Sequence, residues 1–408
     1  MATKPASDPS LSLYRLLDPA VLADPYPLYR RLREEDPVHW DPFLHAWVVT
    51  RYADVHQVLH GFSADRTLSP EQLRALGIDS LEPVAAVMMR QMLFLDPPRH
   101  TQLRKLCSMA FTPRRVELLE DRVTEIAHRL LDQVVPNGTM DVVGDFAAPF
   151  PSMVFAALLG VPEEDHAKLK AWSEIFAEML GNFQHNIDRA PLVLKATAEM
   201  TDYFRRAIHE VERPLADGLL RSLVEAEVDG ERLSEEDVIA NAIVTMVGGQ
   251  ETTTNLIGNG LVTLMERPEA LAALRDRHDL MESAVEELLR FESPSQHTGR
   301  ICPADTVVGG QLIRKGEAVM AVMAAGNRDP ERFADPDMLD LVRAENRHLA
   351  FGWAAHFCFG APLARLEARV AFRALLDRLP NVARASDRLR WRTNLGLRGL
   401  TALPVRFG

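Results

Sequence analysis

Apolar residues recur three or four positions apart along much of the chain, a spacing that places them on one face of an α-helix. One such run follows Val116 and stops before Pro136 and Gly138, which end a helix. Another begins after Ser234, whose side chain can cap a helix, and Asp237 is an acidic stand-in for the usual second residue of the cap. The first run consists of Leu119, Val123, Ile126, Leu130 and Val134.

The second of these helices is predicted to be unusually long, because it can run to Glu266 before Pro268 interrupts it. About thirty residues that each add about 1.5 Å would span on the order of 45 Å. We therefore expect a long central helix that crosses the whole molecule.

Strand-like segments are few and short, namely residues 45–50, 316–322 and 401–406. No linker or repeat divides the chain, so residues 1–408 are expected to form one domain that starts with a short polar tail of about residues 1–20. The predicted fold class is mainly α with a minor β portion. With 408 residues, 47% of them apolar, the chain can bury a large core.

Charge and cysteine content exclude several classes of protein. The chain carries 46 basic and 58 acidic residues, a net charge of −12, which argues against a nucleic-acid-binding protein. Its three cysteines, Cys107, Cys302 and Cys358, are far apart and supply neither a disulfide framework nor a paired-cysteine zinc site. The first ten residues are polar and no run of eighteen apolar residues occurs, so we expect a cytoplasmic protein without a membrane anchor. We also expect it to be a monomer.

One stretch carries most of the chemical information. Residues 348–364 place Cys358 in a glycine-bearing loop, and a helix-compatible run, residues 361–369, follows at once. The positive end of a helix dipole favours the thiolate form of a cysteine near the helix N-terminus. A thiolate in an apolar loop without a second cysteine is suited to be the axial ligand of haem iron, whereas an isolated cysteine is more often a buried structural thiol.

The cysteine loop closely resembles the haem-ligand loop of the cytochrome P-450 family, Phe-Gly-x-Gly-x-(His/Arg)-x-Cys-x-Gly. The resemblance implies the cytochrome P-450 fold of the soluble bacterial type, haem b (iron protoporphyrin IX) as cofactor, and Cys358 as the iron ligand. Ala354 departs from the pattern where the family has glycine, which supplies a backbone conformation that a Cβ disfavours. The matching residues are Phe351, Gly352, His356, Cys358 and Gly360.

A second motif lies within the long predicted helix. Gly248 and Gly249 each cost about 1 kcal/mol relative to alanine in a helix, so they predict a bend or a close approach. With Gln250, Glu251 and Thr252 they resemble the family's oxygen-binding motif, (Ala/Gly)-Gly-x-(Asp/Glu)-Thr. The resemblance implies that Gly249 contacts the haem, that Thr252 hydrogen-bonds oxygen at the iron, and that Glu251 connects this site to water. Taken alone, the glycines would fit a packing notch between helices equally well.

Glu287 and Arg290 are three residues apart and share one helix face, a spacing that usually marks a solvated surface. Their place ahead of Asn327-Arg-Asp-Pro330 and of Arg343 resembles the structural ion-pair core of the same family. The resemblance implies that Glu287, Arg290 and Arg343 support the cysteine loop and take no part in catalysis.

Four basic residues match family partners of the two haem propionates, which need cations or neutral donors. His100 and Arg104 are four residues apart and share a helix face, Arg300 follows Thr298-Gly299, and His356 lies in the cysteine loop. Any one of these four residues taken alone would more often be an ordinary surface residue. The prediction of propionate binding therefore depends on finding all four in the family's order.

The resemblance implies a monooxygenase that inserts one atom of dioxygen by hydroxylation or epoxidation. The sequence contains no flavin, nicotinamide or ferredoxin-type motif, so electrons are expected from a separate ferredoxin and ferredoxin reductase. Arg104, Lys105, Arg114 and Arg115 would form a basic docking patch for the donor. Two alternatives are a peroxygenase driven by hydrogen peroxide and a haem-thiolate binding or sensor protein without turnover.

The substrate is expected to be a lipophilic small molecule, such as a polyketide, a terpenoid or another secondary metabolite. The family's order of elements implies a pocket lined by apolar side chains with few polar anchors, although any packed core would contain the same residue types. The candidate lining residues are Met89, Ile243, Met246, Val247, Gln296, His297 and Leu395.

Overall fold

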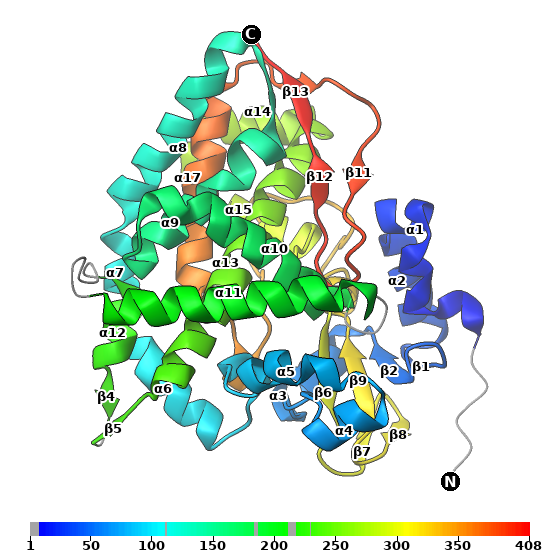
Figure 1. Ribbon diagram of the computed structural model, residues 1–408. Coiled ribbons are helices and arrows are strands. Elements are labelled where there is room, and N and C mark those ends of the chain that lie inside the picture. The colour runs from blue at the N-terminus through cyan, green and yellow to red at the C-terminus, as the bar shows by residue number, and fades with distance from the viewer. Residues whose placement is uncertain (1–7, 111, 183–186, 211–217, 229) are drawn as a thin grey trace. The chain divides into compact units, whose positions relative to one another are not determined.

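The computed structural model describes residues 8–110, 112–182, 187–210, 218–228 and 230–408 (Figure 1). It contains 59% helix and 11% strand, which confirms the predicted fold class of mainly α with a minor β portion. The chain divides into two compact units. The first comprises Met1–Ala64, Asn255–Cys358 and Leu379–Gly408, and the second comprises Asp65–Thr254 and Phe359–Arg378.

The first unit holds most of the β structure. Its helices are α1 (Pro19–Ala23), α2 (Tyr26–Glu35), α3 (Tyr52–Gly61), α14 (Pro268–Asp276), α15 (Met281–Phe291) and α16 (Met323–Gly326). Its strands are β1 (Val38–Asp41), β2 (Ala46–Val49), β6 (Thr298–Ile301), β7 (Thr306–Val308), β8 (Gln311–Ile313), β9 (Ala318–Ala321), β10 (Ala383–Arg384), β11 (Arg390–Trp391), β12 (Leu400–Ala402) and β13 (Pro404–Arg406).

A four-stranded sheet in the order β1-β2-β9-β6 is the main β element. Two of its strands, β2 and β9, lie within the predicted segments 45–50 and 316–322, and they are parallel neighbours with Ala46 opposite Ala318. The predicted segment 401–406 is not one strand, because Leu403 separates β12, which pairs with β11, from β13, which pairs with β10. The sequence pattern therefore located these strands but missed the break.

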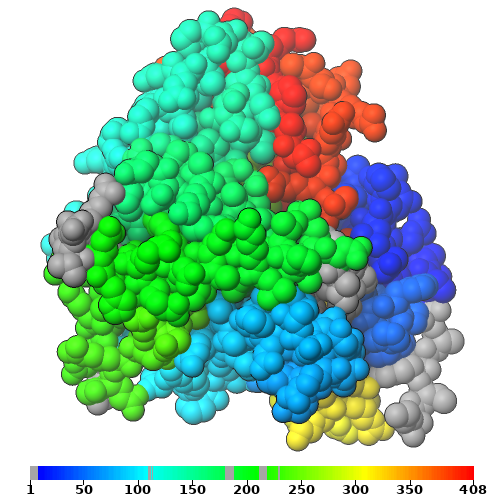
Figure 2. Space-filling view, in the orientation of Figure 1, coloured from blue at the N-terminus to red at the C-terminus, as the bar shows by residue number. Residues whose placement is uncertain are grey.

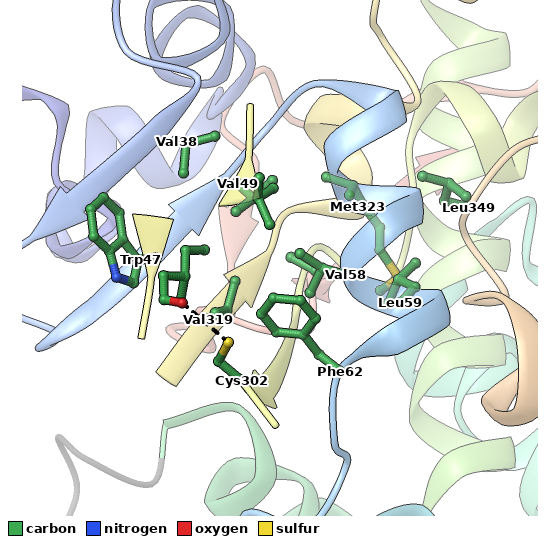
Figure 3. Close-up of a cluster of buried hydrophobic side chains, with 14 residues drawn as sticks. Val38, Trp47, Val49, Val58, Leu59, Phe62, Cys302, Val319, Met323 and Leu349 are labelled. Atoms are coloured by element: carbon green, nitrogen blue, oxygen red, sulfur yellow. Dashed lines mark hydrogen bonds between the residues drawn. The ribbon is translucent and has the colours of Figure 1, made fainter. Parts of the chain in front are cut away.

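A hydrophobic cluster formed by this sheet and α3 makes up one core of the first unit (Figure 3). Trp47 from β2 and Val319 from β9 lie in it, and so does the Cys302 side chain. Leu349, at the start of the cysteine loop, belongs to the same cluster, and the Trp353 ring packs against it. The cysteine loop is thus attached to the core of its unit by apolar contacts.

A buried ion-pair core lies beside the loop. Two nitrogens of Arg290 donate to the two oxygens of Glu287 on α15, both at 2.7 Å, and neither side chain is exposed. Arg343 Nε donates to the same carboxylate at 3.1 and 3.2 Å, and Arg290 Nη1 donates to the Asn327 carbonyl at 2.9 Å. Glu287, Arg290 and Arg343 therefore meet, as the family pattern implies, and the Arg290 guanidinium holds the backbone of a distant segment.

The second unit is almost entirely helical. Its helices are α4 (Pro70–Ala75), α5 (Glu82–Met88), α6 (Arg99–Ala110), α7 (Pro113–Glu117), α8 (Glu120–Val134), α9 (Pro149–Leu159), α10 (His166–Asn182), α11 (Ala190–His209), α12 (Leu219–Glu225) and α17 (Ala361–Arg378), with short strands β3 (Thr139–Asp141), β4 (Glu227–Val228) and β5 (Glu231–Arg232). α17 packs against α8 and α7, and it runs alongside α8 in Figure 1. Figure 2 shows α11 at the surface of this unit.

The long predicted helix is α13 (Glu235–Met265), 31 residues long. Ser234 caps it as predicted, because its side-chain oxygen accepts the Asp237 N–H at 3.1 Å. The Asp237 carboxylate does not take part in this cap but accepts hydrogen bonds from Arg90 at 3.2 Å and Arg99 at 2.5 Å. The run predicted from Val116 to Val134 is divided into α7 and α8, since Thr112 and Pro113 begin a separate short helix.

Two expectations about anchors and tails are refined. Short helical turns begin at Pro9 and bury Leu11, Leu13 and Leu16, so the folded chain starts earlier than the predicted tail allowed. Among the described residues, one helical stretch, Val142–Leu159, is long and apolar enough to cross a membrane, but 78% of it is buried inside the structure. A core segment of a globular protein has the same properties.

The ion-pair core predicts a large stability effect. Arg290→Ala should lower the free energy of unfolding by ~3–5 kcal/mol, because the unexposed Glu287 carboxylate would lose its main partner. Removing the exposed Arg277–Asp279 pair with Arg277→Ala should cost less than ~1 kcal/mol. Urea unfolding of both variants checks this, and equal losses would contradict the assigned role.

Candidate functional site

The cysteine loop is held by its own backbone. The Cys358 N–H donates to the Phe351 carbonyl at 2.7 Å, and the Gly352 N–H donates to the Leu349 carbonyl at 2.8 Å. Between them, residues Ala354–His356 form one turn of 3₁₀ helix. The half-buried Cys358 follows this turn and precedes the first residue of α17 by three positions, as the sequence predicted.

Ala354 has a backbone conformation that favours glycine. Its φ is +56°, in the left-handed region, and Gly352 two residues earlier has φ +68°. A residue with a Cβ pays roughly 1–2 kcal/mol for this conformation, whereas glycine does not. The departure from the family pattern therefore leaves the turn intact at a cost in strain.

Cys358 is also the cysteine best suited to bind a metal. Cys107 is buried, and burial raises the pKa of its thiol to about 12, which disfavours the thiolate. Cys302 is 1% exposed within the hydrophobic cluster (Figure 3). Its thiol donates to the carbonyls of Ala304 at 2.9 Å and Ile313 at 3.5 Å. Neither is available as a ligand, so the donor set of this chain leaves Cys358.

The first unit also contains Arg300 and His356. Arg300 lies in β6, is 4% exposed, and donates from Nη1 to the Thr298 hydroxyl and the Gly299 carbonyl at 3.0 and 2.8 Å. His356 is the last residue of the 3₁₀ turn and is half-buried. Both basic groups are thus on secondary-structure elements of the unit that carries Cys358.

Three predicted pocket residues lie in the first unit, and one of them is corrected. The His297 ring hydrogen-bonds the backbone of buried Leu395, and burial lowers the pKa of the imidazole to about 4, so the ring is neutral. Gln296 is not free to contact a substrate, because its amide oxygen accepts from Tyr29 at 2.9 Å and its nitrogen donates to Ser293 at 2.6 Å. Its side chain connects α2, which carries Tyr29, to the segment after α15 by hydrogen bonds.

The second unit contains His100 and Arg104 on α6. His100 is 2% exposed and Arg104 is half-buried, one helical turn further along. Burial, and after it the nearby Arg104 charge, lower the pKa of His100 below its usual value. His100 is therefore a neutral hydrogen-bonding group, and Arg104 carries the positive charge of the pair.

The accessible side of α13 differs from the one predicted. Ile243, Met246 and Val247 are 0–2% exposed and lie in the packed core, so they do not form the accessible surface. Gly248 is exposed in the middle of the helix, and one turn later the half-buried Thr252 donates its hydroxyl proton to the Gly248 carbonyl at 2.6 Å. Val244 and Thr245, which the sequence reasoning missed, share this face at helical spacing.

The two helix glycines have different roles. A Cβ on Gly249 would lie 2.0 Å from Cε2 of Phe155 on α9, so this glycine is required for close packing between helices. A Cβ on Gly248 would meet nothing within 4 Å. The prediction that Gly249 faces a cofactor is therefore corrected, since the open surface belongs to Gly248. Met89, another predicted pocket residue, is 40% exposed at the end of α5.

The sequence reasoning also missed a buried acid on α17. Glu367 is 1% exposed, it accepts the Thr253 hydroxyl at 3.4 Å, and burial raises the pKa of its carboxyl well above the usual range. A signal was present, because Leu363 and Ala371, one turn before and after Glu367, are apolar. Glu251, the predicted acid of the motif, is also buried, at 5% exposed.

The residues present fit a haem. Cys358, the cysteine that is only half-buried and that lies directly before a helix, is a suitable axial ligand. Gly248 gives α13 a side without a Cβ, against which a flat group can lie. Arg104, Arg300 and the neutral His100 are the donor types that carboxylates require.

Comparison with known proteins shows the family to which the chain belongs. A model of the Cytochrome P450 family matches residues 83–380. Cytochrome P450 monooxygenase PikC of Streptomyces venezuelae is 41% identical over 98% of this chain and 95% of its own length. Polyketide biosynthesis cytochrome P450 PksS of Bacillus subtilis is 36% identical over 94% of this chain and 95% of its own.

Solved structures give the same result. P450BioI, crystallised in complex with hexadec-9Z-enoic acid ligated acyl carrier protein, has a TM-score of 0.89 and 36% identity, covering 96% of this chain and 99% of that one. The structure of PksS has a TM-score of 0.85 and 33% identity over 96% of this chain and 99% of that one. The expected fold is confirmed over nearly the whole length.

The glycine pair predicts opposite outcomes for two neighbouring substitutions. Gly249→Ala should lower the free energy of unfolding by ~1–3 kcal/mol, because the Phe155 ring must move. Gly248→Ala should be neutral or stabilising by up to ~1 kcal/mol, because it meets open space and removes a helix glycine. Urea unfolding of the haem-free protein measures both, and Phe155→Leu should relieve the Gly249→Ala defect.

Proposed function

The chain belongs to the cytochrome P450 family of monooxygenases, and on this basis we propose that it inserts one atom of dioxygen into a lipophilic small molecule. The reaction is a hydroxylation or an epoxidation, and the cofactor is haem b. The observation that carries the proposal is Cys358, which is half-buried at the end of the cysteine loop, whereas Cys107 and Cys302 are buried. Its backbone N–H donates to the Phe351 carbonyl at 2.7 Å, so the backbone that carries the thiol is held in place.

The family pattern assigns the cofactor's binding groups to residues of this chain. Cys358 would hold the iron through its thiolate, and Arg300 and His356 would bind propionate oxygens. Arg104 would add a positive charge, and the neutral His100 would add a hydrogen-bond donor. Haem ligated by thiolate supplies the reductive activation of dioxygen when it is bound.

Thr252 and Glu251 handle protons. The Thr252 Oγ1 proton is held on the Gly248 carbonyl at 2.6 Å, on the accessible face of α13, and rotation of the hydroxyl turns it toward that face. The buried Glu251 carboxyl, one residue before, replaces the proton through water. A hydroxyl that can rotate between two acceptors is suited to this transfer.

The substrate class follows from the surroundings of this face. Val244, Thr245 and Gly248 offer a small, largely apolar surface on α13, and in the first unit His297 is a neutral ring beside the buried Leu395. Such a lining favours a lipophilic substrate with few charged groups. The relatives PikC and PksS, the second named for polyketide biosynthesis, support a secondary metabolite, such as a polyketide or a terpenoid.

Electrons are proposed to come from a separate ferredoxin and its reductase in the cytoplasm, where the enzyme acts as a monomer. Arg365, Arg369 and Arg373 form a basic line on α17, directly after the cysteine loop. The exposed Arg114 and Arg115 lie on α7, which packs against α17. Together these arginines suit an acidic electron donor, in spite of the net negative charge of the chain.

A peroxygenase is the second candidate, and a haem-thiolate sensor without turnover is the third. The intact Glu251–Thr252 pair, with a hydroxyl proton available on α13, favours a reaction that consumes protons with dioxygen. Consumption of NADPH in the presence of a surrogate ferredoxin system, with product formation, separates the monooxygenase from both.

Cys358→Ser should abolish the absorption band that marks thiolate-ligated, carbon-monoxide-bound ferrous haem, together with all oxygenase activity. An alcohol or water ligand cannot supply the electron density of a thiolate. Cys107→Ser is the matched control and should keep the band. A Cys358→Ser protein that keeps the band would show that another residue binds the iron.

Thr252→Ala should leave folding and substrate binding intact but uncouple electron use from product formation. Removal of a positioned proton donor costs ~10²–10⁴-fold in the step that it serves, so electrons would leave as hydrogen peroxide. NADPH consumed, peroxide released and product formed are measured side by side with the wild type. Thr252→Ser keeps a hydroxyl and should restore coupling, whereas full coupling in Thr252→Ala would exclude this relay.

A further inference from the structure

His348 is a buried histidine at the start of the cysteine loop. Its side chain is 2% exposed and lies 3.2 Å, through Nε2, from the Glu286 carboxylate on α15. Its other ring nitrogen, Nδ1, accepts the Ala350 N–H at 3.2 Å. One imidazole therefore joins the helix that carries the ion-pair core to the backbone of the loop.

These two contacts fix the state of the ring. A backbone N–H can only donate, so Nδ1 carries no proton and Nε2 carries the proton that is donated to Glu286. The neutral Nε2–H tautomer is the only form that satisfies both partners, and the negative charge of Glu286 orients it. A flipped ring would replace both nitrogens by C–H groups, and the Nδ1–H tautomer would set two N–H donors against each other at Ala350.

The segment that His348 holds leads to Cys358. Leu349 N–H donates to the Asn327 side chain at 2.6 Å, so the middle of the segment His348–Ala350 is held by a distant residue, and its last N–H is held by the His348 ring. The next residue, Phe351, provides the carbonyl that accepts the Cys358 N–H at 2.7 Å. The Phe351 ring also lies between the rings of His348, at 5.8 Å, and Phe357, at 6.1 Å between centroids.

We propose that Glu286 and His348 are positioning residues that set the place of the Phe351 carbonyl and, through it, the orientation and electron donation of the Cys358 sulfur. This proposal rests on the proposed function, in which Cys358 binds haem iron. Partners outside the first coordination sphere orient a metal ligand and tune its donor strength. Here the influence of Glu286 on the Cys358 sulfur would pass through the His348 ring and the Phe351 peptide group.

The test compares variants on the two sides of the ring in the haem-loaded protein. His348→Phe keeps the ring and removes both hydrogen bonds, Glu286→Gln removes the charge and keeps an acceptor, and His348→Gln keeps a donor toward Glu286. Glu282→Gln is the matched control, because it removes an exposed charge one turn earlier on α15. The readouts are the reduction potential of the haem iron, the rate of haem loss and the hydrogen exchange of the Cys358 amide.

His348→Phe should lose haem ~10-fold faster than the wild type, shift the reduction potential and speed exchange at Cys358. Glu286→Gln should move the same quantities in the same direction by less, His348→Gln should recover part of the loss, and Glu282→Gln should match the wild type. A merely structural role would lower the unfolding midpoint without moving the potential.

Two results would overturn the inference in different ways. In the first, the wild type shows the thiolate spectrum, and His348→Phe and Glu286→Gln have the same reduction potential as the wild type. This result would show that the pair does not act on the sulfur, while the proposed function stands. A wild type that lacks the thiolate spectrum would overturn the proposed function and this inference together. Should His348→Phe not fold, the half-exposed Glu286→Gln substitution decides the question alone.

Discussion

The contact on which most of the first unit depends is the buried pair of Glu287 and Arg290. Two opposite charges without exposure to water are costly unless nearly all of their hydrogen-bonding capacity is used. Arg290 meets this condition by donating to three backbone carbonyls besides Glu287, namely those of Asn327, Pro336 and Met338. The carboxylate in turn accepts from Arg343, Asn346 and the Asp340 N–H. The requirement to satisfy two charges thus gathers an irregular stretch of chain that has few elements of its own, and that stretch ends in the cysteine loop.

Much of the fold and the chemistry could be predicted because it depends on local pattern. The length of α13 follows from apolar spacing between a capping serine and a proline, and the cysteine loop follows from a short motif. The predictions that failed were those of which residues line the site, because they depend on the direction in which each side chain faces after packing. Periodicity shows that Ile243 and Val247 share a face with apolar neighbours, but only the packed helix shows that this face is buried and that Gly248 lies on the open one. Gln296 was misread for the same reason, since its partner Tyr29 is 267 residues away in the sequence.

The adjacent glycines Gly248 and Gly249 in α13 meet two different requirements, although in the sequence they look like one motif. Gly249 is small because the Phe155 ring occupies the place of its side chain, whereas Gly248 has open space in front of it. The first glycine therefore provides the accessible surface, and its carbonyl accepts the Thr252 proton. The second fixes how closely α9 approaches. A pair of glycines that looks redundant thus serves the site with one residue and the packing of the helices with the other.

The left-handed backbone of Ala354 has a consequence for attempts to imitate this site. An alanine has no preference of its own for this conformation, so the neighbouring contacts must impose it: the Leu349 anchor in the hydrophobic cluster, the Gly352 turn and the hydrogen bond from Cys358 to Phe351. A synthetic peptide of residues 348–360 has the right cysteine and the right neighbours in sequence, but none of the surrounding scaffold. It would relax to other shapes in water, and a haem bound to it would have a mobile sulfur ligand. The active loop of this protein is in this sense a property of the whole first unit, which a miniature could reproduce only with glycine at position 354 or with a new support built around it.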